Sequence, residues 1–198
     1  MPFSGNNVKV GPGTLYVAPL ATTEPVATTG AWPAGWVELG YTDTGSTFDF
    51  APKVTPVEVE EEYWPVRQAI TTYEGSTTFA LAEQTRQNLA ISLNAGVGSS
   101  LLSATQGSDV DGSIWQETPA PGTEVRVMVG WDALPEGATT GSDPFGRLII
   151  RQALQTGSLK ITRRKGANKA TYACTFMLEK PNAATQPFRF IFPANLAA

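Results

Sequence analysis

Four glutamates lie within five residues of the run PVEVEEEYW, at Glu58, Glu60, Glu61 and Glu62. Carboxylates at this density are suited to binding a divalent cation or to paired acid–base catalysis. Because valines alternate with the first glutamates, we expect a strand that carries Glu58, Glu60 and Glu62 on one face. Metal sites usually draw ligands from several segments, so we favour a solvated face that discourages edge pairing. An acidic wall along a passage for DNA is a third interpretation, because like charge prevents sticking.

A basic group, Arg163, Arg164, Lys165 and Lys169, marks the turn of a predicted hairpin. Such a group could grip phosphate. No aromatic residues are interleaved with it, however, and the whole chain carries a net charge of −4. A solvated turn and a contact with an acidic surface of a neighbouring subunit are the two interpretations that we retain.

Charge is distributed unevenly along the chain. Residues 1–143 hold 17 acidic and 5 basic residues, a balance of −12, whereas residues 144–198 hold 1 acidic and 9 basic residues, a balance of +8. A molecule with an acidic and a basic pole is suited to head-to-tail contact between copies. The alternative is that the two parts interleave in space, so that no pole forms.

Residues for most catalytic chemistry are missing from the sequence. There is no histidine, the commonest general base and metal ligand, and Cys174 is the one cysteine. The motifs GxGxxG, GxxxxGK(S/T), HExxH and GxSxG do not occur. Asp109 and Asp111 resemble the start of a calcium loop, but the later glutamate is not at the required spacing, so we predict a turn. We therefore expect no enzyme activity, no catalytic residue, no cofactor and no metal site, and a glycosidase using Glu58 and Glu60 is the weakest alternative.

The stretch PVRQAITTYEGSTTFALAEQTRQNLAISLNAG changes its hydrophobic period midway. Its first half alternates like a strand and is rich in β-branched and aromatic residues. Apolar residues in its second half recur at helical spacing up to Gly96, which is a good helix stop. We predict the one helix of the chain at about 83–95, with Leu89 and Leu93 packed against a sheet.

Strand patterns occupy much of the remaining chain. They fall at 8–18, 36–41, 45–51, 54–64, 124–131, 145–155, 157–163, 169–180 and 188–192. We expect segments 157–163 and 169–180 to pair as a hairpin that buries Tyr172, Cys174, Phe176 and Leu178. A strand is favoured over a short helix for 145–155.

Segments rich in proline, glycine and small polar residues predict flexible loops at about 19–33, 98–123 and 135–146, with one hairpin inside the second. We expect Trp32 and Trp36 to pin the first loop to the core, because two tryptophans are costly to leave in water.

Composition agrees with many strands joined by loops. The 198 residues are only 16% charged and include 15 prolines and 19 glycines. We predict one domain over residues 1–198, with a mainly β fold: a β-sandwich or open barrel with one flanking helix. No apolar run approaches the roughly 18 residues of a membrane span, and the N-terminus lacks the pattern of a signal peptide.

The strings VKVGPGTLYVAPL, AWPAGWVELGYTDTGSTFDFAP, PVEVEEE and EGSTTFALAEQTRQNL resemble the major tail tube protein of long-tailed, siphovirus-type bacteriophages, particularly those infecting actinobacteria. The similarity covers roughly the first half of the chain, and the closing PFRFIF agrees more loosely. The resemblance implies a β-sandwich-like core with a helix at its flank. It also implies hexameric rings whose inner sheets join into a β-barrel, stacked head to tail into a hollow tube.

The same resemblance implies a virion protein of the tail, assembled in the host cytoplasm, with no cofactor, no reaction and no membrane. Its partners would be further copies of itself, the tail-tip, tape-measure and terminator proteins, and double-stranded DNA that passes through the lumen without sequence-specific binding. Because such lumens are typically acidic, Glu58, Glu60 and Glu62 become candidate lumen residues. The basic group at 163–169 becomes a candidate inter-subunit contact, and segment 135–146 a candidate arm to an adjacent ring.

Two other functions remain open from the sequence. A related ring-forming terminator or adaptor protein would share these features. A carbohydrate-binding virion module could use Trp32, Trp36 and Trp115, although these lie beside proline and apolar residues.

Overall fold

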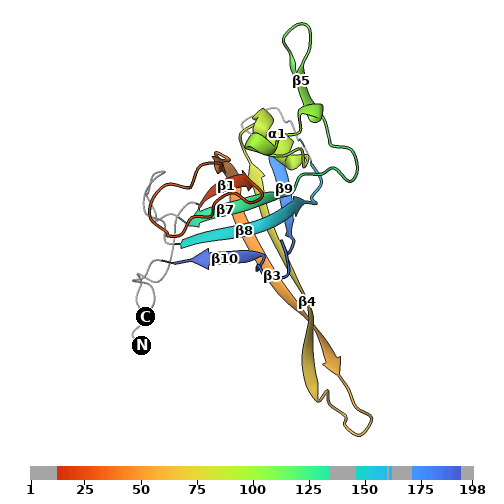
Figure 1. The fold of residues 1–198 in the computed structure, drawn as a ribbon. Helices are drawn as coiled ribbons and strands as arrows, with labels where there is room; N and C mark the ends of the chain where they lie inside the picture. Colours follow the sequence, from red (N-terminus) through yellow and green to blue (C-terminus); the bar gives the residue numbers. More distant parts are fainter. Residues whose placement is uncertain (1–12, 134–145, 160, 162–170, 193–198) are drawn as a thin grey trace.

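The computed structural model describes residues 13–133, 146–159, 161 and 171–192. Within them the chain forms strands and one α-helix (Figure 1). The elements are β1 (Gly13–Pro19), β2 (Val37–Glu38), β3 (Thr42–Val57), β4 (Arg67–Leu81), α1 (Arg86–Ser92), β5 (Gln106–Ser108), β6 (Ile114–Gln116), β7 (Val127–Ala133), β8 (Gly146–Gln155), β9 (Tyr172–Leu178) and β10 (Phe188–Ile191), with short 3-10 turns at Gly98–Ser100 and Ser103–Thr105. The mainly β fold with one helix is as predicted.

The main sheet is antiparallel and has the order β2-β1-β7-β8-β9-β4-β3, with β10 also paired to β8. Strand β8 is the point where the sheet divides. One edge of β8 pairs with β7. The other edge pairs with two strands, with β10 along residues 147–150 and with β9 along residues 153–155. Two layers therefore diverge from β8, one ending in β10 and the other continuing through β9, β4 and β3. This is the open β-sandwich that the sequence predicts.

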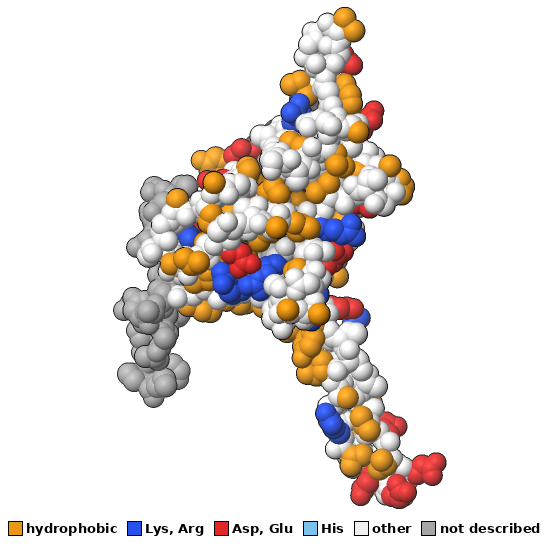
Figure 2. Space-filling model, viewed as in Figure 1, with side chains coloured by type: hydrophobic (Ala, Val, Ile, Leu, Met, Phe, Trp, Pro, Cys, Tyr) orange, Lys and Arg blue, Asp and Glu red, His pale blue; other side chains and the backbone are white. Residues whose placement is uncertain are grey.

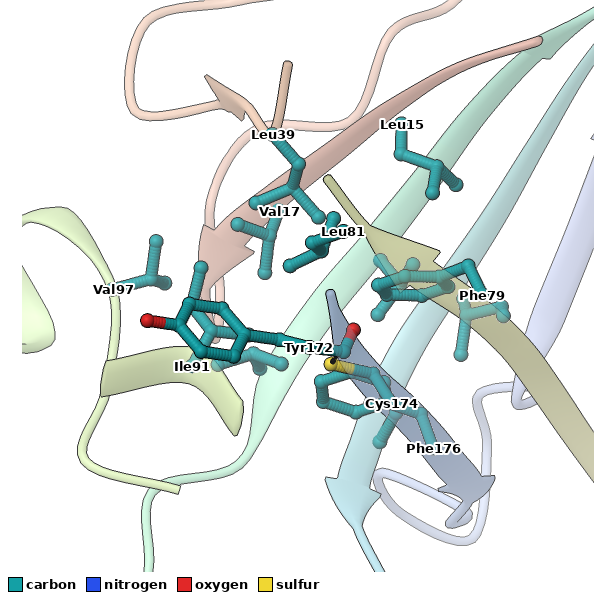
Figure 3. Packing of buried hydrophobic residues seen from close by; sticks show 14 of the residues in the cluster. Leu15, Val17, Leu39, Phe79, Leu81, Ile91, Val97, Tyr172, Cys174 and Phe176 are labelled. Atoms are coloured by element: carbon teal, nitrogen blue, oxygen red, sulfur yellow. Dashed lines mark hydrogen bonds between the residues drawn. The ribbon is translucent and has the colours of Figure 1, made fainter. Parts of the chain in front are cut away.

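The core lies between these layers (Figure 3). Period-2 alternation in each strand turns one apolar row inward. The rows comprise Leu15 and Val17 of β1, Val127 and Val129 of β7, Leu148 and Ile150 of β8, Phe79 and Leu81 of β4, and Tyr172, Cys174 and Phe176 of β9. The predicted buried face of residues 169–180 is confirmed at Tyr172, Cys174 and Phe176, whereas Leu178 is half-buried against the core. Burial raises the pKa of the Cys174 thiol to about 12.

Helix α1 covers one end of the core and is shorter than expected. Thr85 caps it, with its hydroxyl accepting a hydrogen bond from the Asn88 amide at 3.1 Å. It stops before Asn94, whose φ of 57° is left-handed. Ile91, only 1% exposed, is its deepest apolar side chain, while Leu89 is half-buried against the core and Leu93 is half-buried at the C-cap.

The expected strands 45–51 and 54–64 are in fact one strand, β3, which ends at Val57. Pro52 and Pro56 do not interrupt it, because β3 lies at the edge of the sheet, where proline is tolerated. The prediction that Glu58, Glu60 and Glu62 share a strand face is therefore wrong. They lie in the turn between β3 and β4, which the Val66 amide closes by donating to the Val57 carbonyl at 3.0 Å.

The predicted hairpin of 157–163 and 169–180 falls largely on residues 160 and 162–170, which lie outside the described residues; of its described part, the Gly157 amide donates to the Thr175 carbonyl at 3.2 Å. Strand β9 pairs with two strands. One is β8, which precedes the predicted turn, and the other is β4, which is distant in sequence. The described residues of the first segment, 157–159 and 161, form no strand. Strand β8 confirms the extended prediction for 145–155, and the β5–β6 pair confirms the hairpin expected within 98–123.

Candidate assembly surface

Strands β3 and β4 form a long hairpin whose outer part projects away from the body of the molecule (Figure 1). Every residue from 49 to 68 is exposed. Phe50, at the base of this ribbon, packs against Phe188 of β10, and beyond it the described residues leave both faces uncovered. A two-stranded ribbon is marginally stable in water by itself. Within the described part of the chain, the outer part of the hairpin therefore lacks the third strand or packed layer that would stabilise it.

The hairpin concentrates exposed apolar side chains. It holds nine of the 17 large hydrophobic residues that the described chain exposes: Phe50, Val54, Val57, Val59, Tyr63, Trp64, Val66, Ile70 and Tyr73. Tyr63 is fully exposed and Trp64 is 83% exposed. Single exposed apolar residues are ordinary, but such a concentration on one projecting element indicates an interaction surface.

The tip of the hairpin is acidic (Figure 2). Glu58, Glu60, Glu61 and Glu62 all lie in its turn and are exposed. Among the described residues, no group of three or more acidic or cysteine side chains is placed to hold a metal ion. The four glutamates thus form a charged end rather than a chelating pocket.

A second, smaller hairpin, β5–β6, projects from another part of the molecule (Figure 1). Asp111 accepts a hydrogen bond from the Ser113 amide at 2.9 Å within its turn, and this bond lowers the pKa of the Asp111 carboxyl. The turn predicted for Asp109 and Asp111 is confirmed, and Val110 stands fully exposed at its end.

The loop at 20–36 behaves differently, because tryptophans hold it to the sheet. Trp32 and Trp36 pack against Met128 and Ile149 on the outer face of β7 and β8. Gly130 makes room for both rings, since a Cβ there would lie 2.3 Å from Trp32. The Trp32 indole donates to Asp132 at 2.8 Å. The prediction that these tryptophans pin the loop is confirmed.

A buried ion pair completes this attachment. Arg147 and Asp132 meet at 2.9 Å with side chains only 3% and 6% exposed. Arg147 also donates to the carbonyls of Ala27 and Gly30, at 3.0 and 2.6 Å. Burial raises the pKa of Asp132, against the opposing effect of the hydrogen bonds from Trp32 and Arg147.

Two further arginines from the basic end of the chain reach the same loop. Arg151 and Arg189 both pair with Glu24, at 2.5 and 3.0 Å. Part of the positive charge counted in residues 144–198 therefore neutralises acids of the N-terminal part inside the molecule. To that extent, the two parts interleave in space.

A comparison with protein-family models matches residues 2–128 to a family described as phage tail tube protein. The match spans β1 to the start of β7 and includes the whole projecting hairpin. This chain belongs to the phage tail tube protein family. A comparison with curated proteins found no match. As a member of this family, the chain is a structural component of a phage tail. Copies of it assemble into a tube. The family is not a family of enzymes.

The site residues predicted from the sequence lie in different parts of the molecule. Glu58, Glu60 and Glu62 come together at the hairpin tip, whereas Leu89 and Leu93 belong to the body. Arg163, Arg164, Lys165 and Lys169, and the candidate arm 135–145, lie outside the described residues. No helix among the described residues is long and apolar enough to cross a membrane.

Sequence reasoning missed the hairpin as the main projecting element. The available signal was the apolar alternation of Phe48, Phe50 and Val54, which continues across Pro52.

Proposed function

We propose that this chain forms hexameric rings that stack head to tail into the hollow tube of a phage tail, the conduit through which genome DNA is ejected. The observation that carries this proposal is the projecting β3–β4 hairpin, exposed on both faces in a chain of a self-assembling family. A long-tailed, siphovirus-type phage with an actinobacterial host, and contacts with tail-tip, tape-measure and terminator proteins, follow from the sequence resemblance.

The acidic tip has a role in this proposal. Glu58, Glu60 and Glu62 would face the lumen, where negative charge keeps DNA from sticking to the wall. Their exposure and the absence of a metal-binding cluster among the described residues support a role in repulsion rather than chelation. Changing all three to Gln should leave tubes intact but slow DNA ejection from assembled particles. Unchanged ejection would show that the tip contacts protein instead.

The basic residues have a complementary role in the proposal. Arg163, Arg164, Lys165 and Lys169 would contact an acidic surface of a neighbouring subunit. Reversing the charge of Arg163 and Arg164 together should weaken ring formation or stacking while folding is retained. Unchanged assembly would place this segment in solvent.

Negative-stain electron microscopy of the concentrated protein tests the proposed function as a whole. Hollow tubes of stacked, sixfold rings are the expected result. Discrete single rings would favour a terminator or adaptor. A protein that stays monomeric even with a nucleating tail-tip complex would overturn the proposal.

A further inference from the structure

Six aromatic rings form a continuous series along one side of the molecule. Neighbouring ring centroids are 5.1 to 5.9 Å apart, in stacked or edge-to-face geometry. The series runs from Tyr73 through Phe50, Phe188, Phe48 and Phe190 to Phe192. Four of these rings are exposed, those of Tyr73, Phe50, Phe190 and Phe192. The series is therefore an apolar surface and not a closed core.

The series crosses the open mouth of the sandwich. Phe48 and Phe50 belong to β3, and Phe188 and Phe190 belong to β10, in the other layer. Within the described part of the chain, β3 pairs with β4 alone and β10 with β8 alone. The mouth is thus flanked by two free strand edges, and the described residues leave it uncovered.

A groove of about 810 Å³ lies beside the series, between Phe50, Tyr73, Leu178 and Phe188. Two carboxylates on its rim already have partners within the chain. Glu74 pairs with Lys53, and Glu179 pairs with Arg126 at 3.1 Å. The groove therefore offers mainly apolar contact. A small-molecule site would instead place a few polar groups so that they converge on a ligand.

The apolar surface continues onto the projecting hairpin, mainly on one face. Val54 lies opposite Ile70, on the same face as Phe50 and Tyr73. The other face is mostly polar, with Thr55, Thr72 and the Lys53–Glu74 ion pair, and Val57 near the turn is its one large apolar side chain on β3. We use the term apolar stripe for these residues together: Phe48, Phe50, Val54, Ile70, Tyr73, Phe188, Phe190 and Phe192.

The edge beside the stripe is poorly suited to adding a strand. Pro52 and Pro56 lack the backbone N–H that a pairing strand needs. A partner of β3 therefore gains more by packing side chains on the stripe than by extending the sheet along the edge.

We propose that the apolar stripe is the surface on which a second copy of this chain packs, side chain against side chain. This inference rests on the proposed self-assembly. A second copy is favoured because every subunit of a tube has other copies as its neighbours, and because the stripe extends onto a hairpin that projects beyond its own body. An uninterrupted apolar surface repeated on every subunit would otherwise make each of them prone to aggregate.

Thiol labelling tests the inference, because the one native cysteine, Cys174, is buried and its raised pKa keeps it unreactive. Val54→Cys places a thiol on the stripe. Thr55→Cys, the next residue in β3, places one on the opposite face as a matched control. Both substitutions are nearly isosteric and both positions are exposed. Labelling rates are compared in unassembled protein and in tubes seen by electron microscopy.

In unassembled protein both thiols should react readily. In tubes the rate at position 54 should fall by about tenfold or more, as for a thiol moved from water into a closed interface, while position 55 should change less. Equal rates at 54 in tubes and in unassembled protein would overturn the inference and leave the tube proposal standing. Slow labelling at 54 already in unassembled protein would show that the chain covers its own stripe. Equal protection of both positions would exclude one-faced packing and overturn the inference. A native chain that stays monomeric even with a nucleating tail-tip complex would overturn the proposed function, and the inference with it.

Discussion

The loop at 20–36 and the β3–β4 hairpin use the same kinds of side chain in opposite ways. The loop has little regular secondary structure, yet Trp32 and the buried Arg147–Asp132 pair attach it to the sheet. The hairpin is regular over most of its length, yet beyond Phe50, which packs against Phe188, its outer part is exposed within the described chain. Tertiary attachment and regular backbone structure are therefore separate properties here. The loop completes the subunit, whereas the hairpin displays aromatic residues to the outside.

Breaking the attachment of the loop should have the largest effect on folding. Arg147→Ala leaves Asp132 as an unpaired buried charge and removes the donors to Ala27 and Gly30. Loss of one partner of a buried pair costs about 3–5 kcal/mol, so the free energy of unfolding in urea should fall by that amount. Lys53→Ala, which breaks an exposed pair, is the control and should cost under about 1 kcal/mol. Similar losses for both variants would mean that the loop is not held by this pair.

Truncating the helix should have the next largest effect. Ile91→Ala empties a fully buried site, so we expect a loss of about 2–5 kcal/mol in unfolding free energy. Leu93→Ala, at the half-buried C-cap, should cost less than Ile91→Ala. A larger loss for Leu93 in the same urea titration would show that the helix packs through another face.

Removing the helix cap should have a smaller effect. Thr85→Ala deletes the side chain that accepts from the Asn88 amide, and such a change typically costs about 1 kcal/mol. Thr85→Ser retains a hydroxyl and should restore most of this stability. If Ser and Ala were equally destabilising in thermal unfolding, the methyl group and not the cap would be the important feature.

Changes at the hairpin tip should have the smallest effect on folding. Trp64→Ala removes an aromatic that makes little contact within the subunit, so the free energy of unfolding should change by less than about 0.5 kcal/mol. Assembly, measured by sedimentation, should nevertheless decrease. Val110→Ala, at a fully exposed position in the β5–β6 turn, provides the comparison for folding. A tip variant that unfolds readily would show that the hairpin does support its own subunit.

The sequence predicts those parts of the fold in which local pattern and environment agree. Alternation around Phe79 and the change to helical spacing before Leu89 correctly indicate β4 and α1. Pro52 and Pro56 suggest a break that an edge strand does not need. The alternation of valine and glutamate continues past Val57 into a turn, so it wrongly predicts a strand face.

Long-range contacts are the part that sequence patterns do not reveal. Strand β9 pairs not only with β8, the strand before it, but also with β4, which lies about a hundred residues earlier. Arginine and aspartate usually lie at the surface, and only the folded chain shows that Arg147 and Asp132 are buried together. The aromatic series likewise joins β3, β4 and β10, whose separate patterns give no sign that they meet.

Hydrogen–deuterium exchange in unassembled protein and in tubes tests most directly whether the hairpin is displayed for assembly. Amides in segment 49–73 should exchange faster in unassembled protein than in tubes, because neighbouring copies cover the ribbon only after assembly. Amides of the loop at 20–36 should exchange at similar rates in both states. Hairpin amides that exchange equally fast in tubes and in unassembled protein would contradict the account.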